Sequence, residues 1–79
     1  MSNKDLKYLT TIKHYGINWE IYTQQNEDDK NYIDIWVKKE GYGIMDFVIG
    51  LKNTDDWRDY AAAPIIDFIN STEGDPRYE

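Results

Sequence analysis

The sequence contains no cysteine and only one histidine, His14. Without cysteine there is no disulfide framework, so a fold of 79 residues must draw its stability from packing. No cluster of Cys and His shows the spacing of metal ligands, and His14 has no nucleophile near it that would suggest catalysis. These absences predict a protein that is not an enzyme and that holds no metal or cofactor.

Long apolar runs are also lacking. No stretch of 18 apolar residues could span a membrane, and no apolar segment follows residues 1–5 as in a secretory signal. We therefore expect a cytoplasmic protein that makes no contact with membranes. The formal charge of −6, from 15 acidic and 9 basic residues, also opposes direct binding to DNA or RNA, which requires a basic surface.

Apolar residues alternate with polar ones from residue 6 to residue 51, which is typical of half-buried strands. We predict strands over residues 6–14, 17–24, 32–38 and 44–51. Every connection is short, so the simplest topology is an antiparallel meander. The first turn, Tyr15-Gly16, contains a glycine that can adopt the positive φ of a two-residue hairpin.

Side-chain parity predicts the register of this sheet. Ile12 would lie opposite Trp19, Trp19 opposite Ile35, and Ile35 opposite Phe47. These four side chains then share one inner face, and a slip of one residue would expose all of them to water.

After Asn53 the apolar period changes from two residues to 3.6, which predicts a helix. Its apolar stripe consists of Trp57, Tyr60, Ala61, Pro64, Ile65, Phe68 and Ile69. We expect Asn53 or Thr54 to cap the helix, and Trp57 and Phe68 to anchor it on the inner face of the sheet. Pro64 predicts a kink or a break near residues 62–63, and the continuous stripe favours one kinked helix.

The sequence therefore predicts a single α+β domain over residues 1–79, in the order ββββα. It would be a small four-stranded antiparallel meander with one C-terminal helix, with or without a kink at Pro64, packed on one face. Its core would span about residues 6–71, with residues 1–5 and 74–79 flexible.

The outer face of the predicted sheet is the preferred binding site. Its residues combine aromatic rings with carboxylates, as many protein interfaces do, and are Glu20, Tyr22, Tyr32, Asp34, Trp36 and Asp46. The register would set Glu20 opposite Asp34, and a pair of like charges does not favour sheet stability. The alternative is that Tyr and Trp lie there only because they favour strands.

A second candidate surface is purely acidic and consists of Glu27, Asp28, Asp29, Asp55, Asp56 and Asp59. The first three lack the ligand spacing of a calcium loop, so they predict no metal site. A solvated loop and charges at a helix start also explain these residues without any partner.

Together these features favour a binding protein, most plainly an inhibitor that docks on the basic, nucleic-acid-binding surface of another protein. Phage anti-restriction and anti-CRISPR inhibitors, and antitoxin or immunity proteins, are similar in size, charge and architecture, although no motif here matches such a family. The alternative function is a housekeeping adaptor that binds a host protein through the aromatic sheet face, with the charge serving solubility. The outer face could equally close a homodimer.

Overall fold

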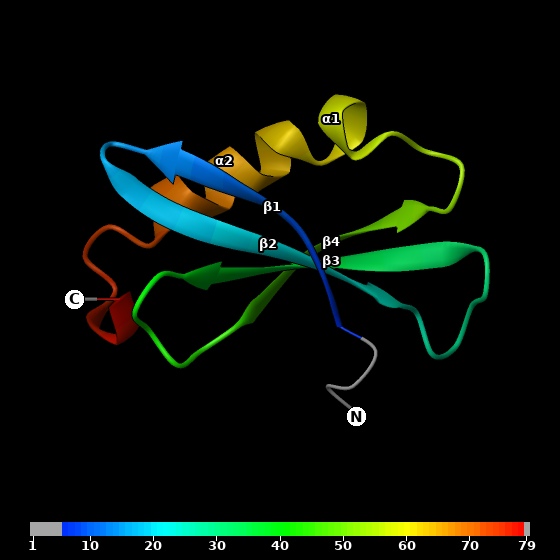
Figure 1. Cartoon of the computed structure of the whole chain (residues 1–79), viewed down its shortest axis with the longest axis horizontal. Coiled ribbons are helices and arrows are strands. Elements are labelled where there is room, and N and C mark those ends of the chain that lie inside the picture. Colours follow the sequence, from blue (N-terminus) through cyan, green and yellow to red (C-terminus); the bar gives the residue numbers. More distant parts are fainter. Residues whose placement is uncertain (1–5, 79) are drawn as a thin grey trace.

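A computed structural model describes residues 6–78 of this chain (Figure 1). Four antiparallel strands form one open sheet in chain order: β1 (Lys7–His14), β2 (Ile17–Gln25), β3 (Tyr32–Lys39) and β4 (Asp46–Lys52). Helices α1 (Trp57–Tyr60) and α2 (Ala62–Ser71) follow, and a turn of 3₁₀ helix spans Pro76–Tyr78. The predicted ββββα meander is confirmed. None of the helices within residues 6–78 is long and apolar enough to cross a membrane.

The β1–β2 hairpin turns at Tyr15 and Gly16, as predicted. Both residues have positive φ, 51° and 78°, which is the signature of a type I′ turn whose twist matches that of the strands. Ile12 pairs with Trp19 across this hairpin, so the first predicted pair is correct.

The pairing of β2 with β3 differs from the predicted register. Trp19 lies opposite Lys39 instead of Ile35, and Glu20 lies opposite Lys38 instead of Asp34. The intervening loop sets this register. The Asn26 side-chain oxygen accepts hydrogen bonds from two backbone N–H groups of the loop, and the Asn26 backbone N–H donates a hydrogen bond to the Tyr32 carbonyl. The shift is an even number of residues, so β2 and β3 keep their predicted faces.

Pro64 explains why the helix is split. Pro64 has no backbone N–H to donate to the Tyr60 carbonyl, and Ala61 has a φ of −111° at the edge of the right-handed helical region, so α1 ends at Tyr60 and α2 begins at Ala62. Pro64 then falls in the first turn of α2, where no intrahelical partner exists for a backbone N–H in any case. The predicted single kinked helix is therefore two helices.

Asp56, rather than Asn53 or Thr54, is the N-cap of α1. Its Oδ1 accepts a hydrogen bond from the Arg58 amide at 2.9 Å, which satisfies one of the amides that the first turn leaves unpaired. The predicted cap was therefore placed two or three residues too early.

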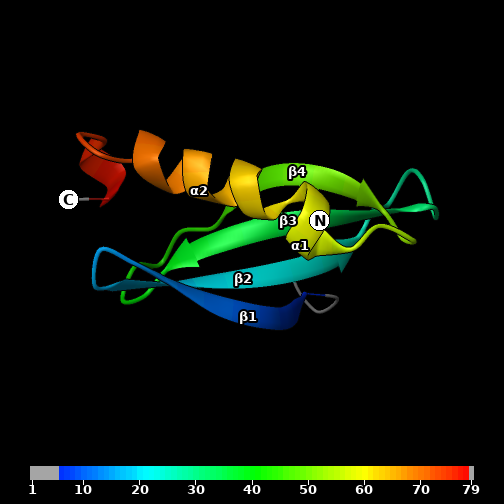
Figure 2. The same cartoon turned by 90° about the horizontal axis from the view of Figure 1, so that it is seen from above.

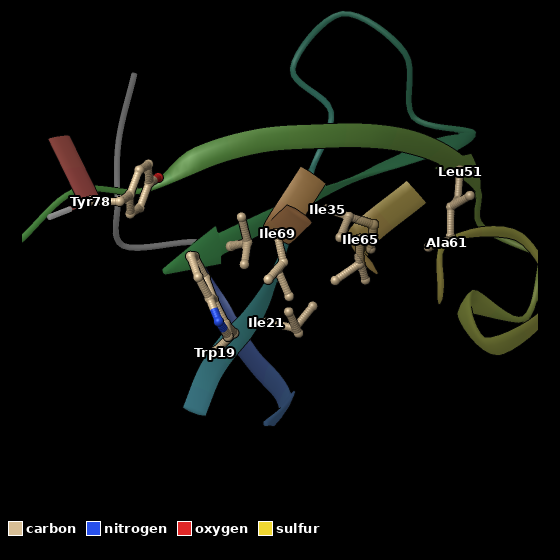
Figure 3. Packing of buried hydrophobic residues seen from close by; sticks show 9 residues of the cluster. Trp19, Ile21, Ile35, Leu51, Ala61, Ile65, Ile69 and Tyr78 are labelled. Carbon is tan, nitrogen blue, oxygen red and sulfur yellow. The ribbon is translucent and has the colours of Figure 1, made fainter. Parts of the chain in front are cut away.

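The core lies between α2 and one face of the sheet (Figures 2 and 3). Its buried side chains come from the sheet, from the helices and from the C-terminal turn: Trp19, Ile21, Ile35, Val37, Leu51, Ala61, Ile65, Ile69 and Tyr78. Trp57 and Phe68, the predicted anchors, pack only at the margin of this cluster. Ile65 and Ile69 are the residues that seat α2 on the sheet.

Tyr78 corrects the prediction that residues 74–79 are flexible. The side chain is only 3% exposed, and its ring centroid lies 5.6 Å from that of Trp19 and 6.3 Å from that of Phe68. The Lys39 ammonium donates a hydrogen bond to the Tyr78 carbonyl at 2.9 Å, and its charge lies over the Trp19 ring. Residues 1–5 and Glu79 lie outside the described residues.

The Tyr78 phenol donates a hydrogen bond to the Asp46 carboxylate, which also pairs with Arg77 at 3.4 Å. Burial, then the hydrogen bond to Asp46, raises the pKa of Tyr78 above its ordinary value of 10.0. Asp46 therefore lies on the helix side of the sheet, and its predicted place on the outer face is wrong.

Replacing Tyr78 with Ala is expected to lower the free energy of unfolding by about 3–5 kcal/mol, because a buried aromatic ring leaves a cavity among Trp19 and Phe68. Tyr60→Ala is the matched control, since Tyr60 is 57% exposed. It should cost less than about 1 kcal/mol. Urea denaturation of both variants measures the difference, and equal losses would contradict the placement of Tyr78 in the core.

The stability of the parent is expected to decline as the pH rises above about 10, because the folded chain holds the Tyr78 proton more tightly than the unfolded chain does. Below that pH the contribution of the protonated Tyr78 to the free energy of unfolding is complete. Tyr78→Phe has no phenol proton and should show a shallower decline, from a lower starting stability. Urea midpoints from about pH 8 to about pH 11 test this; parallel declines for parent and variant would refute it.

Candidate functional site

Four aromatic side chains cross the outer face of the sheet, which is the face opposite α2. Each strand contributes one ring to this aromatic row, and the register sets each ring directly opposite the next: Tyr8, Tyr22, Trp36 and Phe47. Ring centroids lie 5.9 Å apart between Tyr8 and Tyr22 and 5.8 Å apart between Trp36 and Phe47, both edge-to-face. Tyr8 is 60% and Phe47 50% exposed, so the row offers aromatic surface to solvent at both edges of the sheet.

A β-bulge in β1 turns Tyr8 onto this face. Thr10 pairs with Ile21 and Tyr8 pairs with Tyr22, so Leu9 is an extra residue in β1. An extra residue reverses side-chain parity beyond it. Leu9 consequently packs against the core.

A second β-bulge lies in β4. Ile49 pairs with Ile35 and Phe47 pairs with Trp36, which leaves Val48 as the extra residue. Phe47, predicted to lie in the core opposite Ile35, therefore lies on the outer face, and Val48 packs toward the core. Sequence reasoning missed Tyr8 and Phe47 for this reason. The available signal is that each stands next to an aliphatic residue, so that either of the two could face inward.

Trp36, at the middle of the sheet, carries an unsatisfied donor. Its Nε1–H is buried and has no hydrogen-bond partner within residues 6–78. A buried donor left unpaired costs about 1–3 kcal/mol, which an apolar side chain of similar size would avoid.

The two predicted acids that do lie on the outer face are both engaged. Glu20 accepts a hydrogen bond from the Tyr22 hydroxyl at 2.6 Å and lies opposite Lys38. This contact raises the pKa of Tyr22, since deprotonation would set two negative charges side by side. Asp34 accepts from the Asn26 amide at 3.1 Å. Both carboxylates therefore already have hydrogen-bond donors within the same chain.

Tyr32, the remaining predicted residue, lies two positions beyond Asp34 along β3 and opposite Lys52. It therefore belongs to the end of the outer face, away from the aromatic row. Charges on this face and its margins are balanced: Lys13, Lys38 and Lys52 accompany Glu20, Asp34 and Glu40. The face is aromatic and neutral, which differs from the acidic patch that the sequence predicts.

The second predicted set, in contrast, gathers at one end of the molecule. The β2–β3 loop with Glu27, Asp28 and Asp29 meets the connection that leads to α1, because Asn53 bonds the carbonyls of Asn31 at 2.8 Å and Lys30 at 2.6 Å (Figure 1). That connection and α1 carry Asp55, Asp56 and Asp59. We call these six residues the acidic end.

Half of the acidic end has a local structural role. Carboxylates of Asp29, Asp55 and Asp56 accept hydrogen bonds from nearby backbone amides in turns or at the helix cap. Within the part of the chain that the structure describes, no hydrogen bond or ion pair involves the exposed side chains of Glu27, Asp28 and Asp59. These three carboxylates are solvated and accessible.

The acidic excess of the chain is concentrated on the helix side. Residues 53–78, which form both helices and the C-terminal turn, contain six Asp and Glu but only two Arg. Residues 6–52, which form the sheet, contain seven Asp and Glu against six Lys. Aromatic surface and acidic surface are therefore separated in the fold.

A cavity of about 290 Å³ lies at the opposite end from the acidic loops, lined in part by His14, Trp19, Lys39 and Tyr78. His14 Nε2 hydrogen-bonds Asn70 at 2.9 Å, so its ring is held by a structural partner. Among residues 6–78 no three His, Asp or Glu side chains are arranged to hold a metal ion.

Comparisons with known proteins found no matching family model, no matching curated protein and no matching solved structure.

Proposed function

We propose that this chain is a small non-enzymatic binding protein, an inhibitor that docks through its acidic end onto a basic, nucleic-acid-binding surface of another protein. The observation that supports this most is the separation of charge in the fold. The outer sheet face is neutral, whereas the acidic end carries six carboxylates against the nearby Lys30 and Arg58.

Glu27, Asp28 and Asp59 are the carboxylates best suited to this contact. Each is exposed and has no partner of its own within the described residues, so none would have to give up an existing bond to meet a Lys or Arg. Opposite charges across an interface mainly accelerate association, and they let carboxylates take the places that phosphates occupy in a nucleic-acid groove. The positive charge of Arg58 is partly compensated by Asp56, whose Oδ1 lies 3.6 Å from the Arg58 Nη1.

A second candidate function is that of an adaptor which binds a host protein through the outer sheet face. The aromatic row supports it, because aromatic side chains often anchor protein interfaces. Salt separates the two functions, since an aromatic contact depends little on ionic strength and an acidic one depends on it strongly.

The test compares two triple variants that change the net charge equally. Glu27→Gln, Asp28→Asn and Asp59→Asn remove charge from the acidic end, and Glu20→Gln, Asp34→Asn and Glu40→Gln remove it from the outer face while keeping an acceptor oxygen. The parent is used as bait in a lysate, and the captured protein is then purified. We expect its binding to weaken about tenfold or more from about 0.05 M to about 0.5 M salt.

At low salt the first triple variant should lose at least about tenfold in affinity, and the second should bind like the parent. Equal losses for both would mean that only net charge matters. Loss for the outer-face triple alone would transfer the function to the sheet. Either result contradicts the proposal, as does binding that salt leaves unchanged.

A further inference from the structure

No helix or strand within residues 6–78 covers the outer face of the sheet, although the aromatic row crosses it. We propose that a second copy of this chain covers it, in a two-fold symmetric dimer that packs sheet against sheet. This interface uses none of the six residues of the acidic end, so it stands apart from the proposed function.

The charge distribution permits this contact. Two chains of charge −6 repel each other in general, but the outer face and its margins hold three Lys and three acidic residues, so the surfaces that meet are neutral. The acidic helix sides then point away from each other. The helices lie above the sheet along the vertical axis of Figure 1, in which each chain extends 27 Å. Charges on opposite sides of two such chains lie several Debye lengths apart, since that length is about 8 Å at physiological salt.

The register makes the outer face complementary to itself. Tyr22 and Trp36 are opposite neighbours on β2 and β3, and so are Glu20 and Lys38. A two-fold axis parallel to the strands, between β2 and β3, places β2 of one copy over β3 of the other. Each Tyr22 then meets the Trp36 of the second copy, and each Glu20 meets its Lys38. Strand directions stay aligned, as in packed sheet pairs.

The outer face is small. Four strands about 4.8 Å apart and at most nine residues long offer roughly 500 Å². Two copies would therefore bury about 1,000 Å² in total, which is the lower end for a specific interface and fits a weak dimer.

Sedimentation of the purified chain alone tests the proposal, over about 1 µM to about 500 µM. We expect the parent to pass from monomer to dimer in this range. Tyr8→Ser with Phe47→Ser, at two exposed positions, should raise the dissociation constant about tenfold or more. Asp67→Lys, on the exposed side of α2, is the control for charge reversal and should dimerise like the parent.

A charge swap separates the interface from mere damage to the fold. Glu20→Lys and Lys38→Glu should each raise the dissociation constant about tenfold, because like charges then meet across the two-fold axis. An equimolar mixture of the two variants should recover the parent's affinity as a heterodimer, since each altered side chain then meets an opposite charge. A folding defect would not be repaired by mixing.

Three results would overturn the proposal: a parent that remains monomeric throughout the range, a dimer that the Tyr8 and Phe47 changes leave intact, or a mixture that recovers nothing. The first of these would assign the outer face to a different protein, as the adaptor function requires.

Discussion

The packing of Ile65 and Ile69 against the centre of the sheet is the contact on which the rest of this structure depends. These helix side chains meet Ile21 and Ile35 of the two central strands, and all four are buried. Burying each such side chain contributes about 1.5–3 kcal/mol, which is a large share of the stability of a chain this small. Because a single helix can cover only one face of a sheet, the same packing leaves the other face in water.

Much of the fold could be predicted because periodicity survives errors of register. Trp19 pairs with Lys39 instead of Ile35, yet the even shift keeps both central strands on their predicted faces. The helical stripe likewise survives the break at Ala61, except for Tyr60, which was predicted to belong to it and is exposed. The effect of Pro64 was harder to predict. A proline disrupts the interior of a helix but not its first turn, so the effect depends on where the helix begins. Tyr78 follows turn residues with no periodicity, and only tertiary contacts show that it is buried.

The candidate site was harder to predict than the fold, for two physical reasons. A single extra residue, such as Val48, reverses parity, and nothing in its local sequence distinguishes a bulge from a regular strand. Composition, moreover, counts charges without locating their partners. Glu20 and Asp34 look like free acids in the sequence, but each accepts a hydrogen bond from a neighbour on the sheet. The residues of the acidic end lie in loops and in the short helix α1, where the parity of strands does not apply and a bulge cannot displace them.

Both bulges lie in the edge strands, β1 and β4, and this position has a consequence for solubility. A regular edge strand exposes a row of unpaired amides and carbonyls on which further strands can add without limit, and such growth leads to fibrils. A bulge interrupts the spacing of that row and increases its twist, so an incoming strand finds no continuous template. The residues that turn the aromatic rings outward thus also protect a small, cysteine-free sheet from polymerising along its edges.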